Sequence, residues 1–434
     1  MRSNSYDKYY GVTTFGESHG KAIGVVIEDV KPGIEFPLEK IQSALDKRRP
    51  GKGTFSSSRN EKDELQVLSG VFEGKTTGMP ICLLVYNKDA QKQDYEHLKN
   101  LFRPGHADFS YFKKFKIYDH RGGGRASGRE TISRVAASGL VESFLTDISI
   151  NVYPIKIGKF ETTEIDSSFQ NELSWHDKTN YKDLIEYLNY IKKEGNSIGG
   201  IVEVKILGLT AGLGDPVFEK LDANLAKAIL SIGAVKGIEF GDGFELASMK
   251  GNEANDQMNK DGFITNHNGG ILGGISTGDE LVFYFVVKPT PSINITQKTV
   301  TKNNEKVEFE SQGRHDICII PRIIPVAESM IKLVLADALS HQKLISNDKL
   351  ELSDYREAID KIDEDILIAL GRRQKISELI GKFKKENKLQ IKNKEREEEL
   401  LIELKQKAKL LNLDKELVNK IWKLLIIESK NKQS

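Results

Sequence analysis

The chain has 434 residues, a formal net charge of +1 and 38% apolar residues. The length predicts two or three domains, and the near-zero charge argues against nucleic acid or a membrane as a partner. Two cysteines, Cys82 and Cys318, are too few for a disulfide framework or a zinc site. Because no apolar leader is present and no apolar run approaches ~20 residues, we expect a soluble, cytoplasmic protein.

The first part of the chain, up to about residue 345, is rich in glycine and in short β-branched runs. These runs predict strands at Val12–Phe15, Ala22–Ile27, Ile81–Tyr86, Gly200–Leu207 and Leu281–Val287. Helical periodicity lies between them at Leu38–Lys47, Glu130–Leu145, Lys182–Lys193, Leu221–Ser231 and Ile324–His341. The mixture predicts an α+β or layered α/β domain over residues 1–342.

The rest of the chain is densely charged, with only two glycines, Gly371 and Gly381, and no proline. This composition predicts a linker at 343–351 and an all-helical domain at 352–434. From Leu352 to about Glu386 the apolar residues recur at helical spacing, which predicts one helix of roughly 50 Å. A tail of this size cannot cover so long a helix by itself. We therefore expect it to pair with the same helix of a second subunit.

The run Arg121–Thr131 (RGGGRASGRET) is the most distinctive segment of the first domain. Its consecutive glycines let the backbone approach a ligand closely, since no Cβ is in the way. Arginines at 121, 125 and 129 suit phosphate and carboxylate oxygens. Helical sequence follows from Glu130, and a helix N-terminus adds positive potential. The run predicts one wall of an anion site.

Three further clusters of rare residues accompany this run: GESHG at 16–20, RPGHAD at 103–108 and RHD at 314–316. Each lone histidine could be a turn residue that hydrogen-bonds to the backbone. Jointly, these histidines, together with arginines and small residues, indicate a reactive site that titrates near neutral pH.

These segments resemble the chorismate synthase family from about Tyr10 to His341. The motifs that carry the resemblance occur in the family's order: GVTTFGESHG, LDKRRPG, LSGVFEGKTTGMPI, FRPGHAD, RGGGRASGRET, NHNGGILGGISTG, KPTPSI and RHDICIIPR. The resemblance implies a layered β-α-β fold and conversion of 5-enolpyruvylshikimate 3-phosphate to chorismate by an anti-1,4-elimination of phosphate. It also implies reduced FMN as cofactor, with NADPH as a candidate source of its electrons.

The resemblance also assigns roles to residues of the first domain. His19 is implied as proton donor to the leaving phosphate, His106 as the histidine that protonates the reduced flavin, and Asp316 as a proton relay. The implied FMN contacts are Arg125, Ala126, Ser127, Gly233, Ala234, Gly273, Lys288, Pro289, Thr290, Pro291, Ser292 and Arg314. The implied substrate contacts are Ser18, Arg48, Arg103 and Arg129. Residues 52–58 lack an arginine that many family members carry, which puts a contact with NADPH in question.

The tail resembles the all-helical, three-helix class of chorismate mutase, which rearranges chorismate to prephenate. The segments that match are LSDYREAIDKIDEDILIALGRRQKISELIGKFK, KNKEREEELL and IIESKNKQ. The implied catalytic residues are Arg373, Lys384, Glu397 and Gln433. The implied substrate contacts are Arg356, Asn393, Arg396 and Ser429.

The spacing of the basic residues agrees with this resemblance. Arg373 and Lys384 lie eleven residues apart and so share one helix face. Arg356 lies about 25 Å further along the axis, so it would serve the site of a second subunit.

We therefore expect a bifunctional homo-oligomer, tetrameric through the first domain and paired through the mutase helices. One alternative is a monofunctional synthase whose tail oligomerises or senses chorismate. Another is a flavin-binding anion sensor without turnover. The full polar set of the tail argues against the first alternative. The joint presence of His19, His106 and Asp316 argues against the second.

Overall fold

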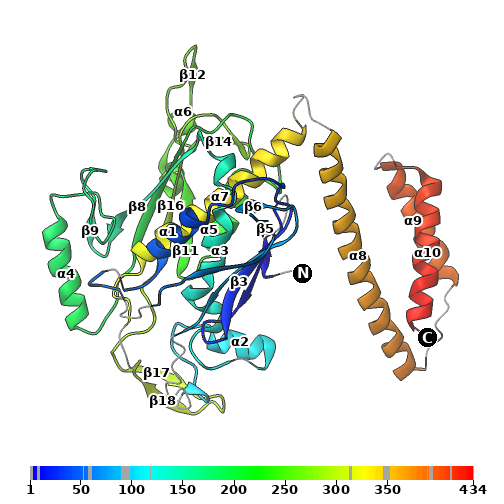
Figure 1. Cartoon of the computed structure of the whole chain (residues 1–434), viewed down its shortest axis with the longest axis horizontal. Helices are drawn as coiled ribbons and strands as arrows, with labels where there is room; N and C mark the ends of the chain where they lie inside the picture. Colours follow the sequence, from blue (N-terminus) through cyan, green and yellow to red (C-terminus); the bar gives the residue numbers. More distant parts are fainter. Residues whose placement is uncertain are drawn as a thin grey trace. The chain divides into compact units, whose positions relative to one another are not determined.

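Figure 1 shows the computed structural model of the chain. The structure describes all residues except 1–2, 7–9, 52, 57–60, 89–97, 118, 312–314, 346–351, 389, 391–393, 411–412 and 434. It divides into two compact units, Met1–Ser346 and Asn347–Ser434. None of the helices in the described part of the chain combines the length and the apolar character that a bilayer crossing needs.

The N-terminal unit contains two antiparallel sheets, each with five strands among the described residues. The first has the order β1-β2-β3-β7-β4, built from Ser5–Tyr6, Val12–Gly16, Ala22–Ile27, Ile81–Tyr86 and Leu65–Ser69. The second has the order β11-β16-β10-β8-β9, built from Val235–Phe240, Leu281–Val287, Gly200–Leu207, Ser149–Ile157 and Phe160–Glu161. Short hairpins pair β5 (Val71–Phe72) with β6 (Lys75–Thr76), β12 (Met258–Asn259) with β13 (Gly262–Phe263), β14 (Ile271–Leu272) with β15 (Ile275–Ser276), and β17 (Gln297–Val300) with β18 (Lys306–Phe309).

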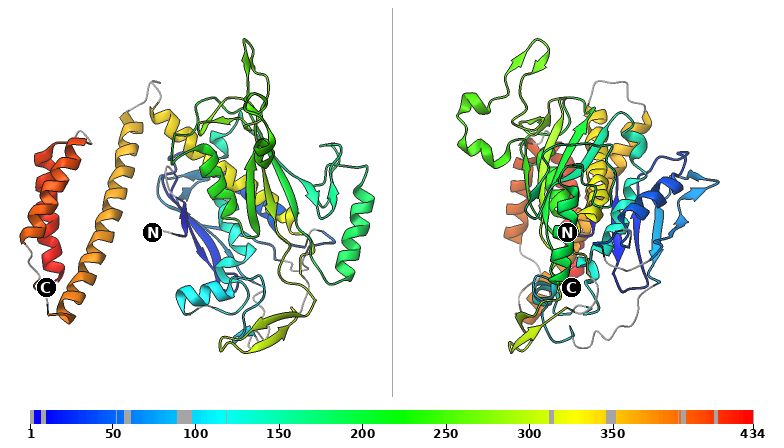
Figure 2. Two further views of the ribbon diagram at one scale, coloured as in Figure 1. Left: turned by 180° about the vertical axis from the view of Figure 1, so that it is seen from behind. Right: turned by 90° about the vertical axis from the view of Figure 1, so that its left-hand side faces the viewer.

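A layer of helices lies between the two sheets, as the views in Figures 1 and 2 show. It consists of α1 (Leu38–Arg48), α3 (Thr131–Ser138), α5 (Leu221–Leu230) and α7 (Ile320–Ile345). Helix α3 packs on β3 of the first sheet, and α7 packs on β8 of the second. The outer helices are α2 (Asp108–Phe115), α4 (Tyr181–Lys193) and α6 (Gly251–Ala254). The predicted layered β-α-β fold is therefore confirmed.

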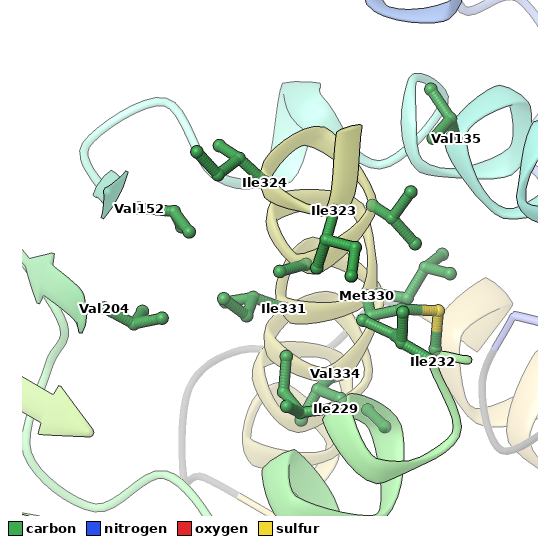
Figure 3. Packing of buried hydrophobic residues seen from close by; sticks show 14 of the residues in the cluster. Val135, Val152, Val204, Ile229, Ile232, Ile323, Ile324, Met330, Ile331 and Val334 are labelled. Atoms are coloured by element: carbon green, nitrogen blue, oxygen red, sulfur yellow. The ribbon is translucent and has the colours of Figure 1, made fainter. Parts of the chain in front are cut away.

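Helix α7 lies at the centre of this layer, with apolar side chains on every side (Figure 3). Ile323 and Ile331 are among its buried residues, and Val204 of β10 and Val135 of α3 belong to the same cluster. Burial of an aliphatic side chain of this size contributes about 1.5–3 kcal/mol. This rigid core holds the loops at the ends of the sheets, where the candidate reactive residues lie.

Most predicted elements are observed, and the largest differences in their bounds have local causes. Strands β3, β7, β10 and β16 have the predicted bounds. The helix predicted for Glu130–Leu145 is wrong in length, since α3 ends at Ser138. There Gly139 lets α1 approach, because a Cβ on it would lie 2.3 Å from Ile41 Cγ1. Helix α7 continues to Ile345, so the first three residues of the predicted linker are helical.

The C-terminal unit consists of three helices in its described residues. They are α8 (Leu352–Glu386), α9 (Lys394–Leu410) and α10 (Lys415–Gln433). Helix α10 packs against both α8 and α9. The predicted three-helix, all-α architecture is confirmed.

Candidate active sites

The glycine run winds into two short 3₁₀ turns, Gly124–Ala126 and Gly128–Glu130, and α3 begins directly after them. Gly122 has a φ of +65°, and a Cβ built on it would lie only 2.2 Å from Cε1 of His19. A side chain at this position would therefore displace the histidine ring. Ser127 accepts a hydrogen bond from the Arg129 amide (3.3 Å) and caps the second turn. Ala126, the last residue of the first turn, is exposed.

His19 lies in a tight turn directly after β2. The turn is closed by a hydrogen bond from the Gly20 amide to the Glu17 carbonyl (3.0 Å). The hydroxyl of buried Ser18 lies 3.0 Å from His19 Nδ1. The sequence clusters GESHG and RGGGR, more than a hundred residues apart, thus meet at this imidazole.

Arg103 joins the glycine run to the second histidine segment. Its guanidinium group binds the Asp108 carboxylate through two hydrogen bonds of 2.7 and 2.8 Å and donates to the Gly122 carbonyl (2.8 Å). Burial alone would raise the pKa of Asp108, but the hydrogen bonds and charge of Arg103 lower it overall. A charged pair therefore fixes the loop that carries His106.

His106 has polar partners on both ring nitrogens. Nδ1 lies 3.0 Å from the Pro104 carbonyl, and Nε2 lies 3.0 Å from the Ser292 hydroxyl. Burial, followed by the charge of Arg103, lowers the pKa of His106 to about 4. The ring is therefore neutral at pH 7. Since the Pro104 carbonyl can only accept, Nδ1 carries the proton and Nε2 accepts from Ser292.

The segment 288–293 bridges His106 and Asp316. Lys288 donates from Nζ to the Gly105 carbonyl (3.0 Å), and Thr290 donates from its hydroxyl to the Asp316 carbonyl (2.7 Å). The Asp316 carboxylate pairs with Arg322 (2.5 Å). The three titrating groups predicted for this site thus belong to one connected set of contacts. Arg314 lies outside the described residues.

Two arginines predicted as substrate contacts, Arg48 and Arg129, are buried in what we call the ionic quartet, with Glu61 and Asp63. Arg48 pairs with Asp63 (3.1 Å), and Arg129 pairs with Asp63 (2.9 Å) and Glu61. Arg48 also donates to the Gly128 carbonyl (3.1 Å). Burial, then the neighbouring Arg322, lowers the pKa of Arg48 to about 9. The two arginines and two carboxylates of the quartet balance in charge, and Arg48 holds the glycine run through its hydrogen bond to Gly128.

We expect Asp63→Asn to destabilise the N-terminal unit by about 3–5 kcal/mol, because it leaves two buried guanidinium groups without their shared carboxylate. Asparagine has nearly the same shape and tolerates the positive φ of this residue, +45°. The measurement is urea denaturation followed through buried Trp175, in a Trp422→Phe background.

Glu64→Gln is the matched control for this substitution. It breaks the solvent-exposed pair with Lys88 (3.2 Å) and should change stability by less than about 1 kcal/mol. Equal losses in the two variants would contradict a buried charge network.

Arg49, unlike Arg48, reaches open space. It lines a cavity of about 430 Å³ together with Lys47, His176, Arg322 and Glu328. Among the described residues, the ion pair given for its guanidinium group is a long one, 3.8 Å to the Asp46 carboxylate. Arg322, the partner of Asp316, borders the same cavity. The resemblance assigned the substrate contact to Arg48, and nothing in the sequence distinguishes the two adjacent arginines.

The predicted cofactor contacts fall into separate groups in this chain. Lys288 lies beside Ala234, whose carbonyl accepts its amide hydrogen (2.9 Å). At Gly233 nothing lies within 4 Å of a Cβ built on it, so its backbone is open to a ligand. A cation, a hydroxyl at Ser292 and open backbone fit a flavin mononucleotide. Pro291 packs on Gly105, where a Cβ would lie 2.8 Å away.

Two other members of the predicted cofactor set lie elsewhere. Arg125 donates to the Gly16 carbonyl (3.1 Å) and the Thr14 hydroxyl (2.6 Å) at the edge of the first sheet. Gly273 lies in the β14–β15 hairpin at the N-terminal end of α5. Gly233 follows the other end of this ten-residue helix, roughly 15 Å away. The structure does not bring Gly273 next to Gly233 within one chain.

In the C-terminal unit, α8 and α10 meet through Arg373. Its guanidinium group donates to the Leu425 carbonyl (2.9 Å) and to the Ser429 hydroxyl. Ser377, one turn further along α8, lies 3.2 Å from the same hydroxyl. The structure thus brings together Arg373 and Ser429, two members of the predicted site.

The other predicted residues of this unit are spread over its three helices. Glu397 on α9 pairs with Lys430 on α10 (2.7 Å). Lys384 is half-buried, and Arg356 is exposed near the start of α8. Arg396 pairs with Glu399 at the surface (3.4 Å). Asn393 and the side chain of Gln433 lie outside what the structure describes.

Comparison with known proteins agrees with this division into two units. The family model described as chorismate synthase matches residues 10–340, and the one described as chorismate mutase type II matches residues 355–434. The chorismate synthase of Syntrophus aciditrophicus is 48% identical over 354 residues, covering 80% of this chain and 100% of that protein. That of Desulfosudis oleivorans is 48% identical over 351 residues, covering 80% of this chain and 99% of that protein.

A solved structure shares the same architecture. It is a crystal structure of chorismate synthase with a TM-score of 0.60 and 27% sequence identity. The superposition covers 83% of this chain and 98% of that one.

Proposed function

The chain belongs to the chorismate synthase family and carries a chorismate mutase type II domain, and we propose that it performs both reactions in sequence. The N-terminal unit would convert 5-enolpyruvylshikimate 3-phosphate to chorismate, and the C-terminal unit would rearrange chorismate to prephenate. The observation that carries this proposal is the connected set of contacts that joins His19, His106 and Asp316. A sensor without turnover has no need to join three titrating groups through one set of contacts.

The first reaction removes a phosphate and a proton from a substrate with several negative charges. Arginine and lysine side chains are needed to offset these charges, and we assign this role to Arg49, Arg322 and Lys288. In this proposal His19 gives a proton to the departing phosphate, while Asp316, held by Arg322, carries away the proton that the ring loses. Reduced FMN, when bound, supplies the electron-rich ring that assists cleavage of the C–O bond.

His106 is neutral in the protein alone, with a pKa lowered to about 4 by burial and by Arg103. An anionic cofactor or substrate beside Arg103 offsets that positive charge and raises the pKa of the imidazole. In this proposal His106 therefore takes up a proton as the site fills, and a reduced flavin bound there would meet a protonated imidazole. NADPH is proposed as the reductant of the flavin, and the alternative is reduction of the flavin by an external system.

The second reaction is a Claisen rearrangement within one molecule, so it needs no nucleophile. The site must hold the substrate dianion in a compact conformation and stabilise charge on the ether oxygen. We assign carboxylate binding to Arg373, supported by Ser429, and ether-oxygen stabilisation to Lys384 and Gln433. Glu397, paired with Lys430, would accept a hydrogen bond from the ring hydroxyl.

We propose that a second copy of this chain covers α8. Ile359, Ile362 and Ile366 lie on this helix with 57, 59 and 51% of their surface exposed. A 35-residue helix is roughly 52 Å long, and a stripe of this kind is buried by a like helix in paired bundles. Pairing would let Arg356 reach the second subunit's site. A tetramer through the N-terminal unit is proposed from family resemblance, and so is a cytoplasmic location.

We expect Ile362→Glu combined with Ile366→Glu to separate the paired C-terminal units, since it places charges in the apolar stripe. Sedimentation analysis should show a smaller assembly, and prephenate formation should fall at least tenfold. Chorismate formation should stay at the wild-type rate. Lys375→Glu, an exposed change on the same helix, should alter neither. An unchanged assembly in the double variant would contradict pairing through α8.

The test of the two activities is a single time course. Purified protein is given 5-enolpyruvylshikimate 3-phosphate and chemically reduced FMN, and phosphate, chorismate and prephenate are measured. We expect phosphate first, then transient chorismate, then prephenate. Chorismate that accumulates without prephenate would support a monofunctional synthase. No phosphate release would support a flavin-binding sensor. A parallel reaction with oxidised FMN and NADPH tests intrinsic flavin reduction.

A further inference from the structure

Asn87, the first residue after β7, uses its whole amide group to join two parts of the first site. Its Nδ2 donates to the Glu17 carbonyl (3.0 Å) and to the Gly20 carbonyl (2.8 Å). Its Oδ1 accepts from Nε of Arg129 (2.5 Å). Its backbone amide also donates to the Lys21 carbonyl (3.0 Å). Both hydrogens of the amide thus hold the turn that carries His19.

The far side of this bridge is a fixed point. Arg129 is buried and held by Asp63 and Glu61 of the ionic quartet. The near side is a turn whose histidine has little room, because a Cβ on Gly122 would lie 2.2 Å from the ring. Small movements of the turn would therefore change where the imidazole lies.

We propose that Asn87 is a positioning residue for the synthase reaction, which fixes the turn at residues 17–20 so that His19 reaches the departing phosphate. This inference rests on the proposed synthase function and on the role of His19 within it. Proton transfer depends steeply on geometry, and a misplacement of about 1 Å can lower a rate ~100-fold. Asn87 itself touches no reacting atom in this proposal.

Aspartate at this position separates the two halves of the bridge. It has nearly the shape of asparagine, and its carboxylate still accepts from Arg129. It has no hydrogens for the Glu17 and Gly20 carbonyls and places a negative oxygen against both. The hydrogen bond from Arg129 is kept, while the two hydrogen bonds to the turn are lost.

The experiment compares Asn87→Asp with the wild type in chorismate formation. We expect kcat to fall ~100-fold, while KM and the affinity for oxidised FMN change by less than about threefold. Prephenate formation from supplied chorismate, on the same polypeptide, should be unchanged and reports that the chain is folded. Asn252→Asp, an exposed change on α6, is the matched control and should leave both activities at the wild-type level.

A double-mutant cycle with His19→Ala separates positioning from general structural support. If Asn87 acts through His19, Asn87→Asp should have almost no further effect once His19 is absent. Independent, additive losses would overturn the proposal, and so would a wild-type kcat in Asn87→Asp. Asn87→Gln is the second variant, because it keeps both donors but lengthens the side chain by one methylene; it should also lower kcat. If the wild type itself makes no chorismate, the proposed function fails rather than the role of Asn87.

Discussion

Replacing Lys384 with alanine is expected to lower prephenate formation 10²- to 10³-fold and to leave chorismate formation at the wild-type rate. The rearrangement builds negative charge on an ether oxygen, and a fixed donor at that oxygen acts mainly on the transition state. Removal of one such donor costs about 2.7–4 kcal/mol in enzymes where it has been measured. The rate of prephenate formation from supplied chorismate gives kcat and KM directly, and we expect the loss in kcat.

Lys385→Ala is the matched control for this variant. Lys385 is the next residue on α8, is exposed, and points about 100° away from Lys384 around the helix. It should leave both rates unchanged. Loss of both activities in Lys384→Ala would contradict two independent sites on one chain.

Local sequence patterns predicted the secondary structure well because the apolar residues of these elements recur at the spacing of a strand or a helix. The strands β3, β7 and β16 are almost entirely apolar, whereas β10 carries Glu203 and Lys205 between its apolar residues. All four are bounded by polar, proline or glycine residues, and their bounds were predicted. The helix predicted at Glu130–Leu145 was too long, because its apolar residues continue past Ser138 as buried turns. The apolar residues beyond Gly139 are buried in the core without forming a helix.

The candidate site was predicted through its motifs but not through its contacts. Sequence adjacency could not separate Arg48 from Arg49. Arg48 is the last residue of α1 and turns into the quartet, whereas Arg49 adopts an extended conformation (ψ 149°) and borders a cavity. The direction of each side chain follows from where the helix ends, which varies by a residue or two in any pattern-based prediction.

The supporting residues Glu61, Asp63 and Asn87 carried no periodic or motif signal. Their partners lie far away in the sequence, as with Asn87 and Arg129, 42 residues apart. Such pairs depend on how the first sheet and α3 pack. The one usable sequence signal is the position of Asn87, a polar residue directly after an apolar strand.

Replacing His106 with alanine is expected to have the reverse effect of Lys384→Ala. Chorismate formation should fall about 10²- to 10⁴-fold, the usual contribution of a positioned acid or base. Prephenate formation should be unchanged when chorismate is supplied. The variant removes the hydrogen bond to Ser292 and the group whose pKa burial and Arg103 lower to about 4.

Proton uptake on ligand binding gives a second, independent measurement for His106. Because the ring is neutral in the protein alone, a rise of its pKa to 7 or above on binding would draw a proton from solution at pH 7. Calorimetric titration of the phosphate substrate in buffers of different ionisation enthalpy should show this uptake in the wild type and lose it in His106→Ala. His341→Ala, which removes the histidine paired with Asp215 (3.2 Å) at the end of α7, should keep both the uptake and the rate. Uptake that survives in His106→Ala would place the responsible group elsewhere in the site, with His19 as the next histidine to replace.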